Sequence, residues 1–509
     1  MTRRHKYAFR RLLAAGMTLS MGACTVGPNF VRPHVASPSS WWTAPGGKAT
    51  SQTVEAPIDT QWWNSFNDPE LMSLENRVAG ANLDVQIAST RLLQSRAQRQ
   101  IVGAEQFPNL DAGASYQRER ASPNGILALT GTSPTGATLS ADPNGYGLSS
   151  LPGSEGSAPF DLWQYSLSAS WELDLWGRIR RGVEAANATQ QAAAETRREV
   201  LLTALAEMAQ DYVQLRATQA LIAIVHQNLD LANQTLNLVQ LRYTNGATTV
   251  LDLANAKAQV ATIAARLPPL ETQQTSLIDA MGLLLAEPPR ALSAELDTPQ
   301  AIPPVPPDVP VGLPSELVRR RPDIREAEAN LHAATANIGV AVASFYPDIT
   351  LNGSAGMQSL QFPTAWNMAS NQYAVGPSIS LPIFEGGKLR GMLRLSKAQQ
   401  REAALDYQRT VLQAWDDVDN ALTAYNEEQQ HHELLQEAVT ANQIAFATAQ
   451  RSYGEGAVDF LNVLSVQSDL IESQSELTQS TAAIDEALIG LYKALGGGWE
   501  SAFPEVAKN

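Results

Sequence analysis

The second half of the chain repeats the first half at a distance of 210 residues, which is a whole number of heptads. Three motifs return at this distance: Arg242-Tyr243, Gly246-Ala247 and Leu251-Asp252-Leu253 become Tyr453, Gly456-Ala457 and Leu461-Asn462-Val463. Mainly apolar residues also recur every seven residues in both copies: Leu201, Met208, Leu215, Ile222, Leu229, Leu236 and Tyr243, then Val411, Val418, Tyr425, His432, Val439, Phe446 and Tyr453. A sustained apolar heptad repeat predicts long helices packed side by side in a supercoil.

The first residues have the features of an export signal. A basic stretch from Arg3 to Arg11 precedes a short apolar run, Leu12 to Ala23, which is too short to span a bilayer as a helix. The run ends in small residues before Cys24, the only cysteine of the chain. This arrangement resembles a bacterial lipoprotein signal, which implies that Cys24 is lipidated and, with Thr25 after it, that the protein is sorted to the outer membrane. An ordinary secretory signal with an incidental cysteine is the alternative.

The charge of the chain excludes one class of partner. The formal net charge is −15, and removal of residues 1–23 takes away five positive charges and leaves −20. Nucleic acid requires a basic surface, so we expect no nucleic-acid partner. No run of 18 or more apolar residues follows the signal, so a membrane crossing would have to use strands.

Four segments alternate between apolar and polar residues and are predicted to be strands. They lie around Leu110–Tyr116, between Trp163 and Leu175, at Ile349–Ala355, and from Tyr373 to Ile383. Each alone would suit a half-buried strand of a soluble sheet. Four of them, placed symmetrically in two repeats and flanked by aromatic residues, favour strands with one face toward lipid.

The connections agree with two long helical hairpins. Residues 121–162 and 357–371 are predicted loops, and each second strand leads directly into a helix. From Gly177 to Asn245 there are 69 residues, or about 100 Å of helix. Such a helix can reach from the outer membrane far into the periplasm, and a shorter helix is predicted to return after each turn.

Several short motifs together resemble the outer-membrane factors of tripartite efflux systems, in particular their lipoprotein branch, the NodT type. The motifs cover the whole mature chain: Cys24-Thr25-Val26-Gly27-Pro28, Trp62-Trp63, Phe107-Pro108-Asn109-Leu110, Trp171 to Arg178, Arg320-Arg321-Pro322-Asp323-Ile324, Phe345-Tyr346-Pro347-Asp348 and the two tip repeats. The resemblance implies a mainly α, mixed α and β fold. It also implies a homotrimer in which four strands per chain contribute to one 12-stranded transmembrane β-barrel, while the long helices form a periplasmic α-barrel.

The resemblance further implies a passive exit duct in the outer membrane. It would conduct small amphiphilic compounds such as antibiotics, delivered by an inner-membrane pump and a periplasmic adaptor, and no catalytic residue, cofactor or metal is expected. The gate is expected at the helix turns, where three copies would form acidic and apolar rings. Ser465 stands where some family members carry an acidic residue. The gate candidates are Leu251, Asp252, Glu455, Asp459, Leu461 and Ser465.

Two further motifs suit ordinary helix positions better than binding sites. His431-His432 lacks a metal-site spacing and suits a helix surface, and Arg319-Arg320-Arg321 suits a helix start better than an anion site. The exit duct of a protein secretion system and a non-conducting structural lipoprotein are the alternative functions. The predicted organisation is a signal peptide (1–23), an extended N-terminal segment (24–66), a first repeat (67–286), a Pro-rich linker (287–313), a second repeat (314–495) and a C-terminal tail (496–509).

Overall fold

The computed structural model describes residues 25–34, 36–42, 51–120 and 159–503. The chain divides into two compact units, each built from both repeats. The first contains Ala97–Asn187 and Ala333–Gln400 with the N-terminal residues up to Phe30, and the second contains Val31–Arg96, Ala188–His332 and Arg401–Asn509. In chain order the strands and α-helices are β1 (Gln52–Val54), α2 (Pro69–Ala81), α3 (Leu83–Ala104), β2 (Asn109–Glu119), β3 (Phe160–Glu172), α4 (Arg178–Thr244), α5 (Val250–Ala264), α6 (Leu267–Leu284), α7 (Ser293–Leu296), β4 (Asp308–Pro310), α8 (Pro314–Arg320), α9 (Pro322–Ala343), β5 (Asp348–Ser359), β6 (Asn371–Ser380), α10 (Lys388–Gly454) and α11 (Phe460–Leu495).

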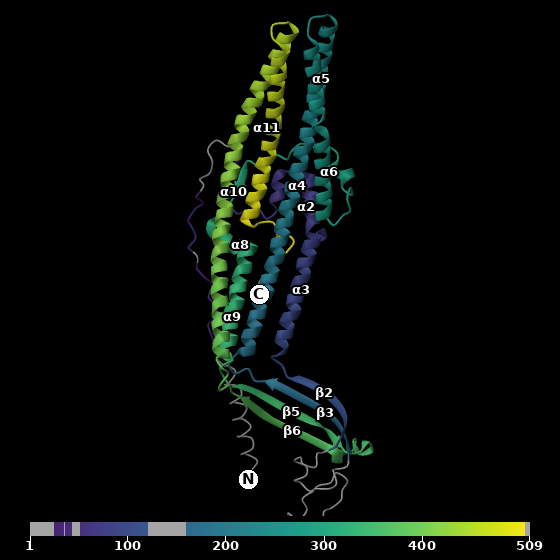
Figure 1. Ribbon diagram of the computed structural model, residues 1–509. Coiled ribbons are helices and arrows are strands. Elements are labelled where there is room, and N and C mark those ends of the chain that lie inside the picture. Colours follow the sequence, from purple (N-terminus) through teal and green to yellow (C-terminus); the bar gives the residue numbers. More distant parts are fainter. Residues whose placement is uncertain (1–24, 35, 43–50, 121–158, 504–509) are drawn as a thin grey trace, which may run out of the picture. The chain divides into compact units, whose positions relative to one another are not determined.

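The first unit contains an antiparallel sheet of four strands in the order β2-β3-β5-β6 (Figure 1). Leu167 on β3 lies opposite Ala112 on β2 and Ala355 on β5, and Ala355 lies opposite Tyr373 on β6. Residues directly opposite in antiparallel strands point to the same face, so the four predicted apolar faces merge into one. Ser168 lies on the other, polar face. The prediction of four strands with one apolar and one polar face is confirmed.

The predicted strand ends need correction. Strand β3 begins at Phe160, inside the predicted loop 121–162, and ends at Glu172. Strand β5 continues to Ser359, and β6 ends at Ser380, so Leu381 and Ile383 follow the strand. Alternation of residue types does not mark where hydrogen-bonded pairing stops, because an extended segment beyond the ladder keeps the same alternation. Most of the loop 121–162 lies outside the described residues.

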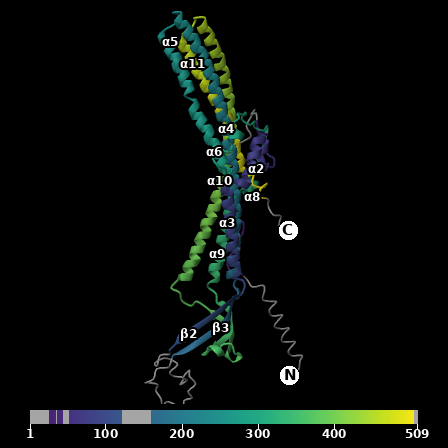
Figure 2. The same ribbon diagram turned by 90° about the vertical axis from the view of Figure 1, so that its right-hand side faces the viewer.

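The two long helices are present as predicted. Helices α4 and α10 have 67 residues each and begin and end at matching positions of the two repeats. In the second unit, Figures 1 and 2 both show α5 beside the last part of α4 and α11 beside the last part of α10. These pairs are the two helical hairpins of the duplicated chain.

The two returning helices differ. In the second repeat α11 is continuous over 36 residues, whereas in the first repeat the return is split into α5 and α6 at Ala265-Arg266. Pro268 and Pro269 explain the break, because neither has an N–H to donate to the carbonyl four residues earlier. Both prolines are tolerated in the first turn of the new helix α6.

Burial within the chain follows the predicted heptads in α10 but not throughout α4. In α10 every heptad residue from Val411 to Tyr453 is buried except His432, which is half-buried. Of the predicted heptad residues in α4, only Leu201, Met208 and Leu215 are buried. Beyond them the buried row is Val225, Ala232 and Val239, three residues later than predicted. Between Leu201 and Gln219 most sides of α4 are buried, so the heptad row is buried there together with other rows, whereas further along the helix only one side is buried.

The segment predicted to be a Pro-rich linker, 287–313, includes short regular elements. It contains α7 and β4, and β4 pairs in parallel with β1, with Thr53 opposite Val309.

Two carboxyl groups of the second unit are buried, and no hydrogen-bond partner for them is present among the described residues. They are Glu75 in α2 and Asp485 in α11. Burial raises the pKa of both groups, that of Asp485 to about 8. Protonation at neutral pH therefore lowers the desolvation cost of Asp485.

Candidate functional site

The two turns that connect the hairpin helices have the same backbone. Gly246 and Gly456 both have positive φ angles, +67° and +79°, and the following alanines, Ala247 and Ala457, donate backwards to the carbonyls of Arg242 and Ser452. This is the helix ending that glycine permits without steric cost. A Cβ on Gly246 would meet no atom within 4 Å, so backbone conformation and not space requires this glycine.

Asp252 caps the helix that follows the first turn. Thr249 is the N-cap of α5, its side chain accepts from the backbone N–H of Asp252, and the Asp252 carboxylate accepts from the Thr249 N–H in return. The hydroxyl of Thr248 also donates to this carboxylate at 2.5 Å. That hydrogen bond is the main reason that the pKa of Asp252 is lowered. Asp252 therefore stays ionised, with its charge at the N-terminus of α5.

The second turn lacks this cap. Asp459 is the N-cap of α11, but its side chain makes no capping hydrogen bond, and Asn462 stands where the first repeat has Asp252. Glu455, Asp459 and Ser465 are exposed in the chain. The four polar gate candidates thus differ: Asp252 is held by neighbouring groups, and the side chains of the other three are open to solvent or to another molecule.

The two leucines predicted to close the gate are exposed within the chain. Leu251 and Leu461 each expose 62% of their surface, whereas Leu253 and Val463, two residues further along, are buried. An apolar cluster joins the two hairpins near their turns, and its buried members are Val239, Leu253, Ala256, Phe446, Tyr453, Phe460, Val463 and Leu470. The packing inside one chain is independent of Leu251 and Leu461, which leaves both available for contacts outside it.

One polar contact near the turns links the repeats, and the sequence analysis did not identify it. The Arg242 guanidinium at the end of α4 donates to the backbone carbonyl of Tyr453 at the end of α10, and lies over the Tyr453 ring at 4.6 Å from its centroid. Tyr453 is buried, whereas its counterpart in the first repeat, Tyr243, is exposed. The sequence gives one indication of this contact. Arg242 has no arginine counterpart in the second repeat, where Ser452 stands, so its role is specific to the first repeat.

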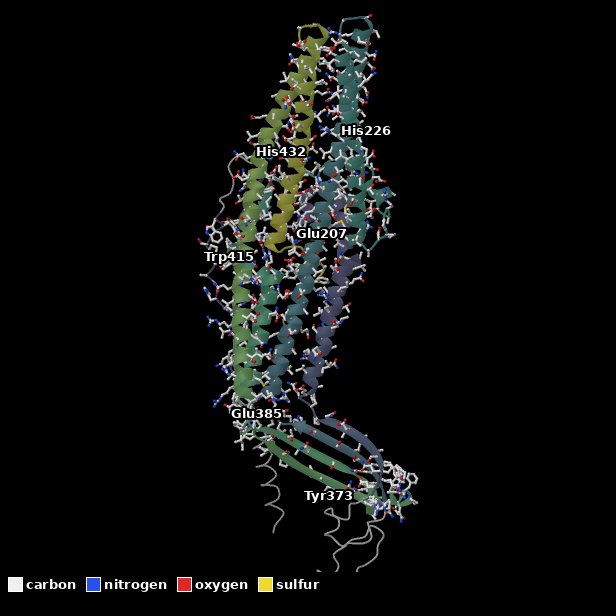
Figure 3. The ribbon with its side chains drawn as sticks, viewed as in Figure 1. Glu207, His226, Tyr373, Glu385, Trp415 and His432 are labelled. Carbon is white, nitrogen blue, oxygen red and sulfur yellow. The ribbon has the colours of Figure 1, made fainter. Side chains whose placement is uncertain are left out.

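The histidine pair lies on α10 (Figure 3). His431 has its Nδ1 at 3.1 Å from the Glu428 carboxylate, and His432 is half-buried, which lowers its pKa. No group of three or more histidine, cysteine, aspartate or glutamate residues in the described chain could hold a metal ion.

Cys24 lies outside the described residues, but the residues that follow it contact other parts of the first unit. The Val26 N–H donates to the carbonyl of Trp176, between β3 and α4, at 3.1 Å. Gly27 lies so near α9 that a Cβ on it would be 2.5 Å from the Cα of Gly339. The residues directly after the predicted lipid anchor are therefore packed at the strand–helix junction.

Among the described residues, no helix is long and apolar enough to cross a membrane.

Comparison with known proteins defines the family. Residues 74–283 and 313–497 match the family described as "Outer membrane efflux protein". The chain belongs to this outer membrane efflux protein family, in agreement with the resemblance in its motifs and with its fold.

Relatives and solved structures of similar sequence cover nearly the whole chain. The pyoverdine export outer membrane protein OpmQ of Pseudomonas putida is 31% identical over 499 residues, which are 97% of this chain and 99% of the relative. The toluene efflux pump outer membrane protein TtgC of Pseudomonas putida is 29% identical, with 96% of each chain covered. The solved structure of the outer-membrane channel OprN is 29% identical and has a TM-score of 0.83, over 94% of this chain and all of that one.

Proposed function

We propose that the protein is the outer-membrane exit duct of a tripartite efflux system. It passively conducts small amphiphilic compounds that an inner-membrane pump and a periplasmic adaptor deliver to it. The observation that carries this proposal is the combination of a sheet with one apolar face and two 67-residue helices that start from its strands. The related proteins named for pyoverdine and toluene support small organic compounds as the cargo.

We propose a homotrimer, as the family resemblance implies, and the two edges of the sheet support pairing with other copies of the chain. Strands β2 and β6 each pair with a single strand among the described residues, so each has one row of unpaired backbone groups. Such groups are very costly in lipid, and pairing with the edges of neighbouring copies removes that cost. Four strands are fewer than the eight of the smallest membrane barrels, so one chain cannot close a barrel alone, and the trimer that the family resemblance implies would supply twelve.

The gate of this duct is proposed at the hairpin turns. Three copies of the exposed Leu251 and Leu461 form an apolar constriction, and Asp252 with Glu455 and Asp459 forms an acidic entrance that favours cations. Ser465, one turn further along α11, faces the same passage.

Single-channel recording in planar bilayers tests the proposal. The purified protein is expected to open cation-selective channels, and Leu461→Ser is expected to raise their conductance. In cells that lack the gene, restored resistance to an amphiphilic antibiotic is expected with the wild-type protein. Absence of both conductance and resistance would instead support a non-conducting structural lipoprotein.

A further inference from the structure

The first turns of α10 carry positive charges without compensating negative ones. Between Gly386 and Arg401 the sequence has five basic residues and no acidic residue. Arg390, Arg394 and Lys397 are spaced by four and three residues and so share one face of the helix. All three are exposed, and none has an ion pair or hydrogen bond to another residue of the described chain. We refer to these three residues as the cationic stripe.

The corresponding region of the first repeat is neutralised within the chain. Three arginines at the start of α4 each have a carboxylate partner: Arg178–Glu172 at 2.6 Å, Arg180–Asp174 at 3.2 Å and Arg181–Glu184 at 2.7 Å. At this strand–helix junction, the arginines of the first repeat are therefore paired with carboxylates, whereas the cationic stripe of the second repeat is not.

Each of those carboxylates is absent from the second repeat. At the shift of 210 residues, Pro382, Phe384 and Arg394 replace Glu172, Asp174 and Glu184. Arg180 is kept as Arg390, but its partner Asp174 has become Phe384, whose side chain is 90% exposed. The nearest preceding carboxylate, Glu385, is exposed between β6 and α10 (Figure 3). In the second repeat, an exposed apolar side chain therefore stands where the first repeat has the carboxylate that pairs with its arginine.

The cationic stripe is unfavourable for the isolated chain. Like charges three or four residues apart on a helix repel each other. Positive charge is also disfavoured near a helix N-terminus, and the first turn of α10 has no acidic residue to offset it. Because no carboxylate of the described chain pairs with the stripe, an anion from outside the chain would stabilise it.

The residues before the stripe indicate where that anion lies. The apolar face of β6 is followed by Leu381, Ile383 and Phe384, all exposed, Ile383 by 92%. The cations come next. An apolar strand, then an exposed aromatic residue, then basic residues is the order found where a protein leaves the hydrocarbon for the headgroup layer. We propose that the cationic stripe binds the headgroups of anionic phospholipids on the periplasmic side of the outer membrane. This inference depends on the sheet lying in that membrane, and not on what the duct conducts.

Lipid titration monitored by native mass spectrometry of the full-length protein tests the inference. The probes are phosphatidylglycerol, which is anionic, and phosphatidylcholine, the control whose zwitterionic headgroup has no net charge. Each basic residue near a membrane surface contributes about a fivefold gain in binding, so Arg390→Gln/Arg394→Gln/Lys397→Gln should weaken phosphatidylglycerol binding on the order of a hundredfold. Binding of phosphatidylcholine should not change. The charge-matched control Lys257→Gln/Arg266→Gln/Arg451→Gln removes three exposed cations of the second unit and should bind phosphatidylglycerol like the wild type.

A second variant restores the chemistry of the first repeat. Phe384→Asp supplies Arg390 with the carboxylate that Asp174 gives to Arg180, and should weaken phosphatidylglycerol binding without removing a cation. Wild-type affinity in both variants would refute the inference. So would a change of oligomeric mass in the triple variant with lipid binding unchanged, because the stripe would then contact another copy of the chain. Channel conductance, measured in parallel, reports on the proposed function separately.

Discussion

The contact between Arg242 and Tyr453 predicts how strongly the two hairpins are held together near their turns. Arg242→Met removes the guanidinium but keeps a side chain of similar length. A hydrogen bond from a charged donor contributes about 1.5–3 kcal/mol, and a partly exposed cation–π contact about 0.5–1 kcal/mol. Both use the same group and are not additive, so we expect a loss of about 2 kcal/mol. That loss changes the ratio of separated to packed hairpins by roughly 30-fold.

Tyr453→Phe is the matched control. The acceptor of the hydrogen bond is the backbone carbonyl, and the ring stays in place, so both parts of the contact remain. The Tyr453 hydroxyl is itself buried with no hydrogen-bond partner in the described chain, and its removal should be neutral or slightly stabilising.

Two measurements on the same proteins read out the effect. Single-channel recording should show longer or larger openings for Arg242→Met, and hydrogen exchange should be faster in the last turns of α4 and α10. Tyr453→Phe should match the wild type in both. If Arg242→Met also matches it, the apolar cluster alone holds the hairpins, and the energetic role assigned to Arg242 is wrong.

Four further predictions concern the anchor, the sheet, the gate and a buried carboxyl group. Cys24→Ser should be exported but should not incorporate labelled fatty acid; unchanged labelling would disprove the lipoprotein assignment. Leu167→Arg, on the apolar face of β3, should cost roughly 2–4 kcal/mol and reduce assembly, whereas Ser168→Arg should assemble normally, and equal assembly of both would contradict a lipid-facing sheet. Asp252→Asn should lower the cation-to-anion permeability ratio in bilayers and leave assembly intact, since asparagine can still accept the capping hydrogen bonds; an unchanged ratio would place selectivity elsewhere. Because the pKa of Asp485 is raised to about 8 in the folded protein, stability should fall as pH rises from about 4 to 8, and Asp485→Asn should raise the melting temperature at pH 8 but not at pH 4.

The sequence predicted those parts of the fold that depend on repetition. The heptad pattern and its repetition after 210 residues predicted the two long helices, which have 67 residues each. The alternation of apolar and polar residues predicted the four strands and their apolar sides, because a regular period fixes which residues share a face. The burial of Val225 and Ala232 in place of Leu229 was not predictable from the pattern, since the twist of one helix about another decides it.

The candidate gate shows the same limit. The repeat motif places Leu251 and Asp252 beside the turn, but the exposure of Leu251 and the capping hydrogen bonds of Asp252 depend on how the chain folds around that turn. In the sequence, Arg242 is recognisable only as part of the repeated turn motif. Its contact with Tyr453 joins residues 211 positions apart, and such a pairing is set by the packing of two helices and not by local sequence.

The break between α5 and α6 gives the two hairpins different mechanical properties. In the proposed trimer, three of the returning helices would be continuous, as α11 is, and three would be interrupted at Ala265-Arg266. Under a force along the helices, the interrupted return of the first repeat is expected to bend before the continuous α11 does. The reason is that Pro268 and Pro269 remove two backbone hydrogen bonds at the interruption. The two prolines after the first turn would therefore make two otherwise similar hairpins differ in stiffness.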